Sequence, residues 1–237
     1  MKNDLANINL YLTDPHPCSY LTDQQASTIF VEPNVTLTKN QYTELSSLGF
    51  RRSGSYVYQP HCANCHACIP VRVIVNQFEP NRQQKRIIRY NQDLQIKQVK
   101  PQLTKEYFWL YERYIGMRHT DGDMYPATRE QYQSFLVDAP DYCSFYEFKK
   151  DGQLLAVAVV DLLEDSLSAV YTFFEPLEHR RSLGQYAILW QIEECKRLGL
   201  SYLSLGYWIK NCRKMSYKLQ YRPVELFINQ RWIQLNS

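Results

Sequence analysis

Three cysteines, Cys62, Cys65 and Cys68, stand three residues apart in a chain of 237 residues. Thiolates at such short intervals are typical ligands of zinc or of an iron–sulfur cluster. Cys18 follows a proline-rich start of the chain, and we expect it to join the other three in one cluster. The spacing therefore predicts a metal site at these four cysteines, with burial of the thiols without a metal as the alternative.

Basic side chains gather in the same part of the chain. Residues 49–91 carry seven Lys or Arg and a single acid, Glu79. Four of the bases recur at intervals of three and four residues over 81–91, where we predict a helix, so they share one face of it. A solvent-exposed face usually mixes charges of both signs, and the lack of acids here favours contact with a polyanion. These bases are Arg82, Lys85, Arg86 and Arg89.

A second basic block lies at the C-terminal end of the sequence. Residues 175–237 carry ten Lys or Arg and five acids, while residues 92–174 are acidic overall. Two basic blocks of this kind either fold together into one cationic groove or form two unrelated exposed faces. The candidates are Arg180 and Arg181, in a turn before a predicted helix, and Lys210, Lys214 and Lys218, which form a stripe if their segment is helical.

The elements that must position these residues follow from hydrophobic periodicity and from helix caps. Helices are expected over residues 23–30, 40–48, 81–91, 104–119, 129–136 and 182–198. Strands are expected over 56–58 and 71–75, on either side of a turn at Asp151-Gly152, over 167–174 and 202–207, and in a terminal strand or hairpin from residue 226. The proline-containing residues 97–102 are expected to link two domains.

The order of elements after residue 143 is typical of one fold class. Three strands, a basic turn, a helix and a further strand follow one another, as in acyltransferases of the GCN5-related type. The turn over 178–184 is poorer in glycine than a loop that cradles coenzyme A, which leaves room for another acyl donor. We therefore predict an α+β protein. A GCN5-related acyltransferase-like domain with a central mixed sheet flanked by helices spans 99–237, and a smaller cysteine-bearing α+β domain spans 1–98.

Composition places the chain among globular proteins. Hydrophobic residues make up 45% and aromatic residues 14% of the sequence, which is enough for a sizeable core. No basic start followed by an apolar run is present at the N-terminus, and the longest apolar stretch, 154–163, is too short to span a bilayer. We expect a cytoplasmic protein without a membrane partner and, despite its seven cysteines, without a disulfide framework.

Seven strings of the sequence are specific enough to compare with known families. They are PHPCSYL (15–21), GFRRSGSYVYQPHCANCHACIP (49–70), QQKRIIRYN (83–91), RHTDGDMYP (118–126), SAVYTFFEP (168–176), RRSLGQYAILWQIE (180–193) and GYWIKNCRKMSYK (206–218). Together they resemble the arginyl/leucyl-tRNA–protein transferase family, most closely its bacterial, leucine-transferring branch. The resemblance covers essentially the whole chain.

The resemblance implies a reaction in which leucine moves from leucyl-tRNA to the α-amino group of a protein that begins with Asp or Glu. The product carries an N-terminal leucine that marks it for degradation. The implied partners are leucyl-tRNA, acceptor proteins or peptides, and the downstream degradation machinery, and the transfer itself requires no cofactor. The cysteine pattern departs from that of the eukaryotic arginyl members, because Leu21 and Ala67 stand where those members have cysteine.

Three groups on the central strands are candidates to relay protons in such a transfer, namely Asp161, Tyr171 and Tyr207. An N-terminal amine has a pKa of about 8, so proximity can supply most of the rate and a strong base is not essential. The alternative for either tyrosine is a structural role in which its hydroxyl is hydrogen-bonded within the fold, and this is the commoner case for a buried tyrosine.

The acidic side chain of the acceptor requires a cation that tRNA phosphates do not occupy, ideally a bidentate arginine. Arg51 or Arg52 is assigned to this role, since both follow a helix-ending glycine within a highly specific string. The helix over 81–91 is assigned to tRNA. The other substrate-binding candidates are Arg180, Arg181, Lys210, Lys214 and Lys218, with Arg180, Lys210 and Lys214 expected at the tRNA end.

Two functions of other classes compete with this interpretation. One is a zinc-knuckle RNA-binding protein without catalysis, and the other is a coenzyme A-dependent N-acetyltransferase. The first does not explain the acyltransferase pattern after residue 143. The second lacks a glycine-rich loop for the pyrophosphate of the cofactor.

Overall fold

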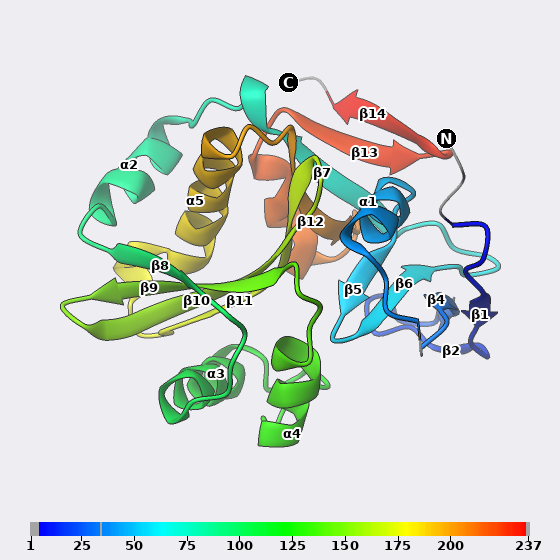
Figure 1. The fold of residues 1–237 in the computed structure, drawn as a ribbon, viewed down its shortest axis with the longest axis horizontal. Coiled ribbons are helices and arrows are strands. Elements are labelled where there is room, and N and C mark those ends of the chain that lie inside the picture. The colour runs from blue at the N-terminus through cyan, green and yellow to red at the C-terminus, as the bar shows by residue number, and fades with distance from the viewer. Residues whose placement is uncertain (1–4, 34, 236–237) are drawn as a thin grey trace.

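The computed structural model describes residues 5–33 and 35–235, which form two main β-sheets (Figure 1). The smaller sheet has the strand order β1-β4-β6-β5, and the larger has the order β14-β13-β7-β12-β11-β10-β9-β8. In the larger sheet β11 and β12 pair in parallel, whereas the other ladders are antiparallel. The predicted α+β class with a central mixed sheet is therefore confirmed.

The elements follow one another in the order in which Figure 1 labels them. The strands are β1 (Leu10–Leu12), β2 (His16–Pro17), β3 (Gln25–Ala26), β4 (Thr28–Val31), β5 (Arg51–Ser53), β6 (Tyr56–Pro60), β7 (Ile69–Ile74), β8 (Gln95–Val99), β9 (Cys143–Lys150), β10 (Gln153–Leu162), β11 (Ser166–Phe174), β12 (Tyr202–Trp208), β13 (Val224–Ile228) and β14 (Arg231–Leu235). The α-helices are α1 (Lys39–Ser47), α2 (Arg82–Tyr90), α3 (Lys105–Arg118), α4 (Arg129–Tyr132) and α5 (Leu183–Arg197). Short 3₁₀ or π segments are η1 (Val75–Gln77), η2 (Gln133–Val137), η3 (His179–Arg181) and η4 (Arg213–Gln220).

The helix predicted over 23–30 is wrong, because this segment forms β3 and β4. Thr28, Ile29 and Val31 are β-branched, and β4 pairs antiparallel with β1 on one side and β6 on the other. Pairing within a sheet thus prevails over the local helix signals. The predicted helix over 40–48 is confirmed as α1, which begins with a capping box between Thr38 and Gln41.

The expected linker over 97–102 also differs from the structure, because its first residues belong to β8. This strand pairs antiparallel with β9 at one edge of the large sheet. The large sheet thus takes β7 from before residue 98, while β8 crosses that position. The division into 1–98 and 99–237 stays a prediction, and strands from both sides of it share one sheet.

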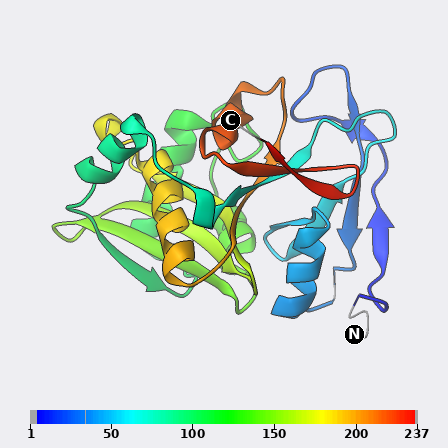
Figure 2. The same ribbon diagram turned by 90° about the horizontal axis from the view of Figure 1, so that it is seen from above.

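Helices cover both faces of the large sheet (Figures 1 and 2). The core on one side, next to α2 and α5, contains the fully buried Ala187 and Ile192. The core on the other side, next to α3 and α4, contains Tyr111 and Phe173. A third, smaller cluster lies under α1 around Tyr42. The sheet is thus held in place from both sides, and its strand ends are rigid supports for a site.

The two parallel strands of the large sheet, β11 and β12, pair over a short length only. The ladder of β11 and β12 covers three residue pairs and ends at Ser168 and Ser204. On its other side β12 pairs with β7, and the register shifts between Ser204 and Tyr207, where Gly206 has a φ of +77°. Such a left-handed residue in a bulge re-aims the side chains that follow it. The last residues of β12 are thereby turned toward the N-terminal sheet.

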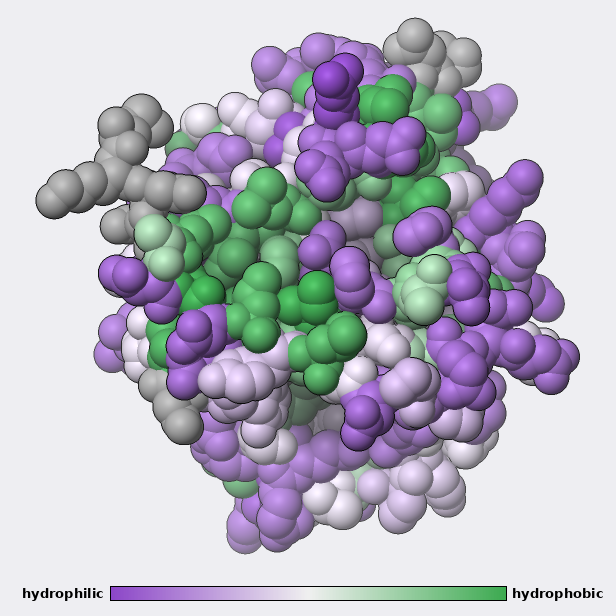
Figure 3. Space-filling view, turned by 90° about the vertical axis from the view of Figure 1, so that its right-hand side faces the viewer, coloured by the Kyte–Doolittle hydropathy of each residue, from purple (hydrophilic) through white to green (hydrophobic). Residues whose placement is uncertain are grey.

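The N-terminal strands leave apolar surface uncovered. Figure 3 shows green apolar side chains gathered on the right-hand face of the molecule. The edge strand β1 contributes Leu10, Tyr11 and Leu12, each more than half exposed. Within the described residues, every helix is too short or too polar to cross a bilayer.

Candidate functional site

Segments far apart in the sequence meet where β11 and β12 end. Lys214 of η4 forms an ion pair of 2.7 Å with Asp121, in the loop after α3. His119, next to this loop, lies 3.1 Å from the hydroxyl of Tyr114, and Tyr114 packs on Phe174 at the end of β11. Burial, followed by the charge of Lys214, lowers the pKa of His119. This face therefore joins three segments that carry family-specific strings.

Arg52 and Asp161 form a buried ion pair between β5 and β10. Nε and Nη2 of Arg52 donate to the two carboxylate oxygens at 2.8 and 2.6 Å, and both side chains are almost fully buried. Burial opposes the charged guanidinium, yet the carboxylate raises the pKa of Arg52 above its usual value. The geometry supports neither the acceptor role predicted for Arg52 nor the relay role predicted for Asp161, because the two side chains are already paired with each other.

Arg51, the preceding residue on β5, points to the opposite side of the strand. Its Nη1 donates to Ser46 and to the carbonyl of Phe50, but its Nε and Nη2 are buried with no partner among the described residues. Tyr58, the register partner of Arg51 in β6, has its carbonyl 3.3 Å from the hydroxyl of Tyr207. Lys218 of η4 donates its Nζ to the carbonyl of the same Tyr207 at 2.6 Å. Burial, followed by the charge of Arg51, lowers the pKa of Lys218 to about 8. The fold thus brings together two substrate-binding candidates from distant parts of the chain.

The two tyrosine candidates differ in what their hydroxyls do. The hydroxyl of Tyr207 lies 2.9 Å from the carbonyl of Gly49 and 3.3 Å from that of Tyr58, to which it can donate its one proton. This contact ties β12 to the N-terminal sheet and favours the structural alternative. The hydroxyl of Tyr171 is buried with no partner in the described part of the chain, beside the ring of Tyr114. Of the three predicted relays, Tyr171 alone keeps an uncommitted group.

The thiol of Cys68 is affected by the other thiols of this region. Burial, together with the nearby thiols of Cys18, Cys62, Cys65 and Cys212, raises the pKa of Cys68 to about 12. Cys212 joins the four predicted cysteines, which its place in the basic tail did not indicate. Among residues 5–33 and 35–235, however, no three His, Cys, Asp or Glu side chains are arranged to hold a metal ion. Zinc or an iron–sulfur cluster at these cysteines stays a prediction, and no step below depends on it.

Helix α2 is confirmed, and its bases share one exposed face. Asn81 caps its first turn, and Gln84 and Ile87 are buried on the inner side. The amide of Gln84 donates to the carbonyl of Gln220, which fixes the helix to the tail of the chain. The outer side borders an open hollow of about 890 Å³, lined by Arg82, Lys85, Arg86 and Arg89. Contact with tRNA at this hollow stays a prediction.

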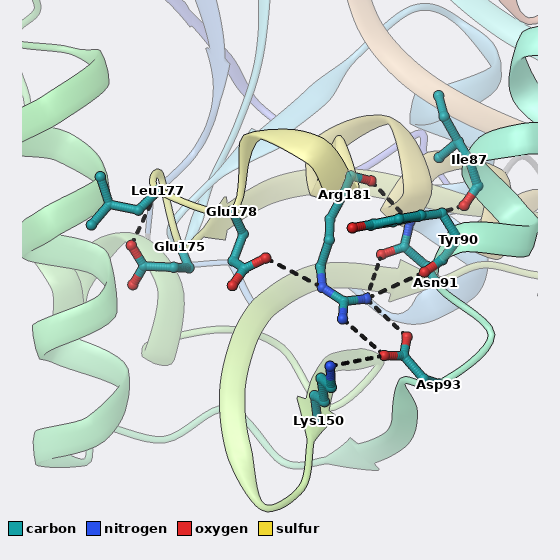
Figure 4. Close-up of polar contacts among 9 residues, drawn as sticks. All are labelled: Ile87, Tyr90, Asn91, Asp93, Lys150, Glu175, Leu177, Glu178 and Arg181. Carbon is teal, nitrogen blue, oxygen red and sulfur yellow. Dashed lines mark hydrogen bonds and ion pairs between the residues drawn. The ribbon is translucent and has the colours of Figure 1, made fainter.

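Arg181 is part of a structural network (Figure 4). Its guanidinium donates to both carboxylate oxygens of Asp93 at 2.8 Å, and Asn91 donates to the Arg181 carbonyl. Hydrogen bonding to Arg181 lowers the pKa of Asp93 to about 2, and Lys150 lies 3.4 Å from the same carboxylate. The network fixes the turn before α5 to the segment after α2, and it leaves Arg181 little freedom to bind a substrate.

The basic stripe predicted for the tail is not formed. The segment is the 3₁₀ helix η4, which has about three residues per turn, so a spacing of four does not keep side chains on one face. Lys214 is exposed and paired, whereas Lys218 is buried. Lys210, just before η4, and Arg180, in η3, are exposed and remain suited to phosphate contact.

The surroundings of Arg51 were not predicted from the sequence. Tyr42 of α1 is fully buried, and the rings of Tyr58 on β6 and Tyr207 on β12 lie 6.1 Å apart. The charge of Arg51 acts on Tyr42, Tyr58 and Tyr207, which belong to one helix and to a strand of each main sheet. The available signal in the sequence is its high tyrosine content, with 19 in all. That number does not say which tyrosines meet.

The fold is thus a mixed sheet covered by helices on both faces, with an exposed row of bases on α2 and two buried cations, Arg51 and Lys218, elsewhere. Two family descriptions match the sequence, "Arginine-tRNA-protein transferase, N terminus" over residues 16–86 and "Arginine-tRNA-protein transferase, C terminus" over residues 106–228. The chain belongs to the arginine-tRNA-protein transferase family, which confirms the resemblance drawn from its sequence strings.

Curated relatives match over the full length. An "Aspartate/glutamate leucyltransferase" of Pseudomonas fluorescens (strain Pf0-1) is 60% identical over 98% of this chain and 99% of its own. A protein of the same name in Pseudomonas entomophila (strain L48) is 57% identical with the same coverage. The predicted enzyme class, a transferase, is thereby confirmed. Among solved structures, FemX has a TM-score of 0.47 and 9% identity to this chain, and the match covers 91% of this chain and 84% of FemX.

Proposed function

We propose that this protein transfers leucine from leucyl-tRNA to the α-amino group of proteins that begin with Asp or Glu. The observation that carries the proposal is the 57–60% identity, over nearly the whole chain, to relatives named aspartate/glutamate leucyltransferase. The leucine that is added marks the acceptor for degradation. The enzyme acts in the cytoplasm, where leucyl-tRNA is available, and its product passes to the degradation machinery.

The reaction is aminolysis of an ester. The acceptor amine attacks the carbonyl carbon of the leucyl ester, a C–N bond forms, and the bond to the ribose oxygen breaks. One amine proton ends on that ribose oxygen, so the step needs neither a redox partner nor a nucleophilic side chain. Since the free amine has a pKa of about 8, correct placement of the two substrates supplies most of the acceleration.

The fold supplies a scaffold for this placement. We assign the large sheet and α5 to the GCN5-related acyltransferase-like arrangement, because α5 joins the parallel strands β11 and β12, which pair over only three residues. The exposed bases of α2, with Arg180 and Lys210, contact tRNA phosphates. Of the three candidate relays, Tyr171 keeps a hydroxyl without a partner among the described residues, and we assign the proton relay to it.

The test is a transfer assay with radiolabelled leucyl-tRNA. Peptides that begin with Asp or Glu are expected to gain label, whereas a peptide that begins with Lys and an Asp peptide with an acetylated amine are expected to gain none. Acetyl-coenzyme A, offered instead of leucyl-tRNA, separates the acetyltransferase alternative. Binding of tRNA without any labelled peptide would instead support an RNA-binding protein without catalysis.

A further inference from the structure

Two buried cations, Arg51 and Lys218, are linked through Tyr58 and Tyr207 and have no acidic partner among the described residues. Arg51 is 4% exposed and Lys218 is 8% exposed. In the described part of the chain, neither takes part in an ion pair. The groups that act on Lys218 are Arg51 and the thiols of Cys212 and Cys68, and no carboxylate is among them. A buried charge is normally paired, so this arrangement is costly unless an anion joins it.

The hydrogen-bonding capacity of the pair is only partly used. Three N–H bonds of Arg51, on Nε and Nη2, have no partner within residues 5–33 and 35–235. Lys218 donates to the carbonyl of Tyr207 and approaches the sulfur of Met215 at 3.8 Å, which is a weak acceptor. The edge of a guanidinium that includes Nε and Nη2 is the one that binds a carboxylate with two parallel hydrogen bonds.

The neighbouring arginine shows what that edge binds when the chain supplies the acid. Arg52 uses the same two atoms, Nε and Nη2, to hold both oxygens of Asp161. Arg51 therefore presents the same pattern of donors on the opposite side of β5, but without an acid among residues 5–33 and 35–235. Arg51 and Arg52 are both buried, so solvent exposure of Arg51 does not explain why it lacks an acidic partner.

The residue before Tyr207 in β12 is a glycine whose Cα lies near the ammonium of Lys218. Gly206 lies in the bulge of β12 with a φ of +77°, and a Cβ added there would come within 3.6 Å of Nζ of Lys218. Bulges of this kind are common beside binding sites, because they re-aim neighbouring groups. The positive φ favours glycine at this position, and no side chain of residue 206 therefore lies against the ammonium of Lys218.

We propose that Arg51 and Lys218 together bind the side-chain carboxylate of the first residue of the acceptor. This inference rests on the proposed function and names the part of the site that selects Asp and Glu. The carboxylate would accept two hydrogen bonds from Arg51 and one from Lys218, and it would neutralise a buried charge. An Asn side chain has the same shape as Asp but offers one acceptor and no charge, so it would leave the pair unbalanced.

The pocket is tested by calorimetric binding of short peptides to the full chain without tRNA. A peptide that begins with Asp is expected to bind about tenfold or more tightly than its Asn counterpart, the range for a charge-assisted contact. Arg51→Gln and Lys218→Gln are each expected to remove this preference while affinity for the Asn peptide is kept. Lys97→Gln is the matched control, since Lys97 lies on β8, four strands from β12, and it should keep the preference.

The outcomes separate this proposal from the function on which it rests. A pocket variant that keeps the wild-type preference for Asp over Asn overturns the pocket, even if transfer occurs. A loss of leucyl-tRNA binding with unchanged peptide preference would assign the two cations to a tRNA phosphate instead. Preferential binding of the Asp peptide without any leucine transfer would uphold the pocket and refute the proposed reaction.

Discussion

Replacing Asp161 by alanine should destabilise the protein strongly. The change leaves the guanidinium of Arg52 buried and unpaired, because it removes two hydrogen bonds of 2.8 and 2.6 Å. Breaking a fully buried ion pair on one side costs about 3–5 kcal/mol. For a chain of this size, 1 kcal/mol shifts the melting temperature by roughly 2–4 °C, so Asp161→Ala should melt roughly 6–20 °C below the wild type.

The assay combines thermal unfolding with leucine transfer at a temperature where every variant is folded. The double variant Arg52→Met/Asp161→Leu is the control, because an apolar pair of similar volume often replaces a buried ion pair without loss of stability. It should recover most of the melting temperature and most of the transfer activity. If Asp161→Ala lowers the free energy of unfolding by less than about 1 kcal/mol, the structural role is refuted. If the double variant is stable but does not transfer leucine, Asp161 is restored as a catalytic group.

Three further predictions concern the tRNA face, a candidate relay and the pH dependence of stability. Changing Lys85, Arg86 and Arg89 together to alanine should reduce the slope of log affinity for tRNA against log salt by about one unit for each phosphate that the helix no longer neutralises; an unchanged slope in a filter-binding titration would place tRNA elsewhere. Tyr207→Phe should cost about 1 kcal/mol of stability, the value of one hydrogen bond, and leave the transfer rate within about twofold, whereas a large fall in kcat with unchanged melting would make its hydroxyl catalytic. The folded-state pKa of Asp93 is depressed to about 2, so the contribution of its charged form to stability is present above the unfolded pKa of about 4 and is lost as the pH falls toward 2. In urea unfolding at pH 2 to 6, Asp93→Asn should therefore lose less stability on acidification than the wild type. Identical profiles of stability against pH for the two proteins would contradict this prediction.

Local sequence signals were sufficient where an element depends on its own residues. The helices α2 and α3 begin where Asn81 and Thr104 can cap them, and the hairpin of β9 and β10 turns at Asp151-Gly152. These features depend only on residues a few positions apart, which a single sequence shows directly. The helix expected over 23–30 was wrong, because the strand that forms there depends on partners in β1 and β6 that lie elsewhere in the chain.

The sequence by itself determined the family, the reaction class and the basic face of α2, since these depend on residue types at fixed spacing. Only the tertiary structure decided what the two adjacent arginines do. Arg51 and Arg52 are equivalent in the sequence, but alternation along β5 turns one toward Asp161 and the other toward Lys218. Which side of a strand meets an acid depends on how distant strands pair, and that pairing is a property of the whole fold rather than of any local pattern.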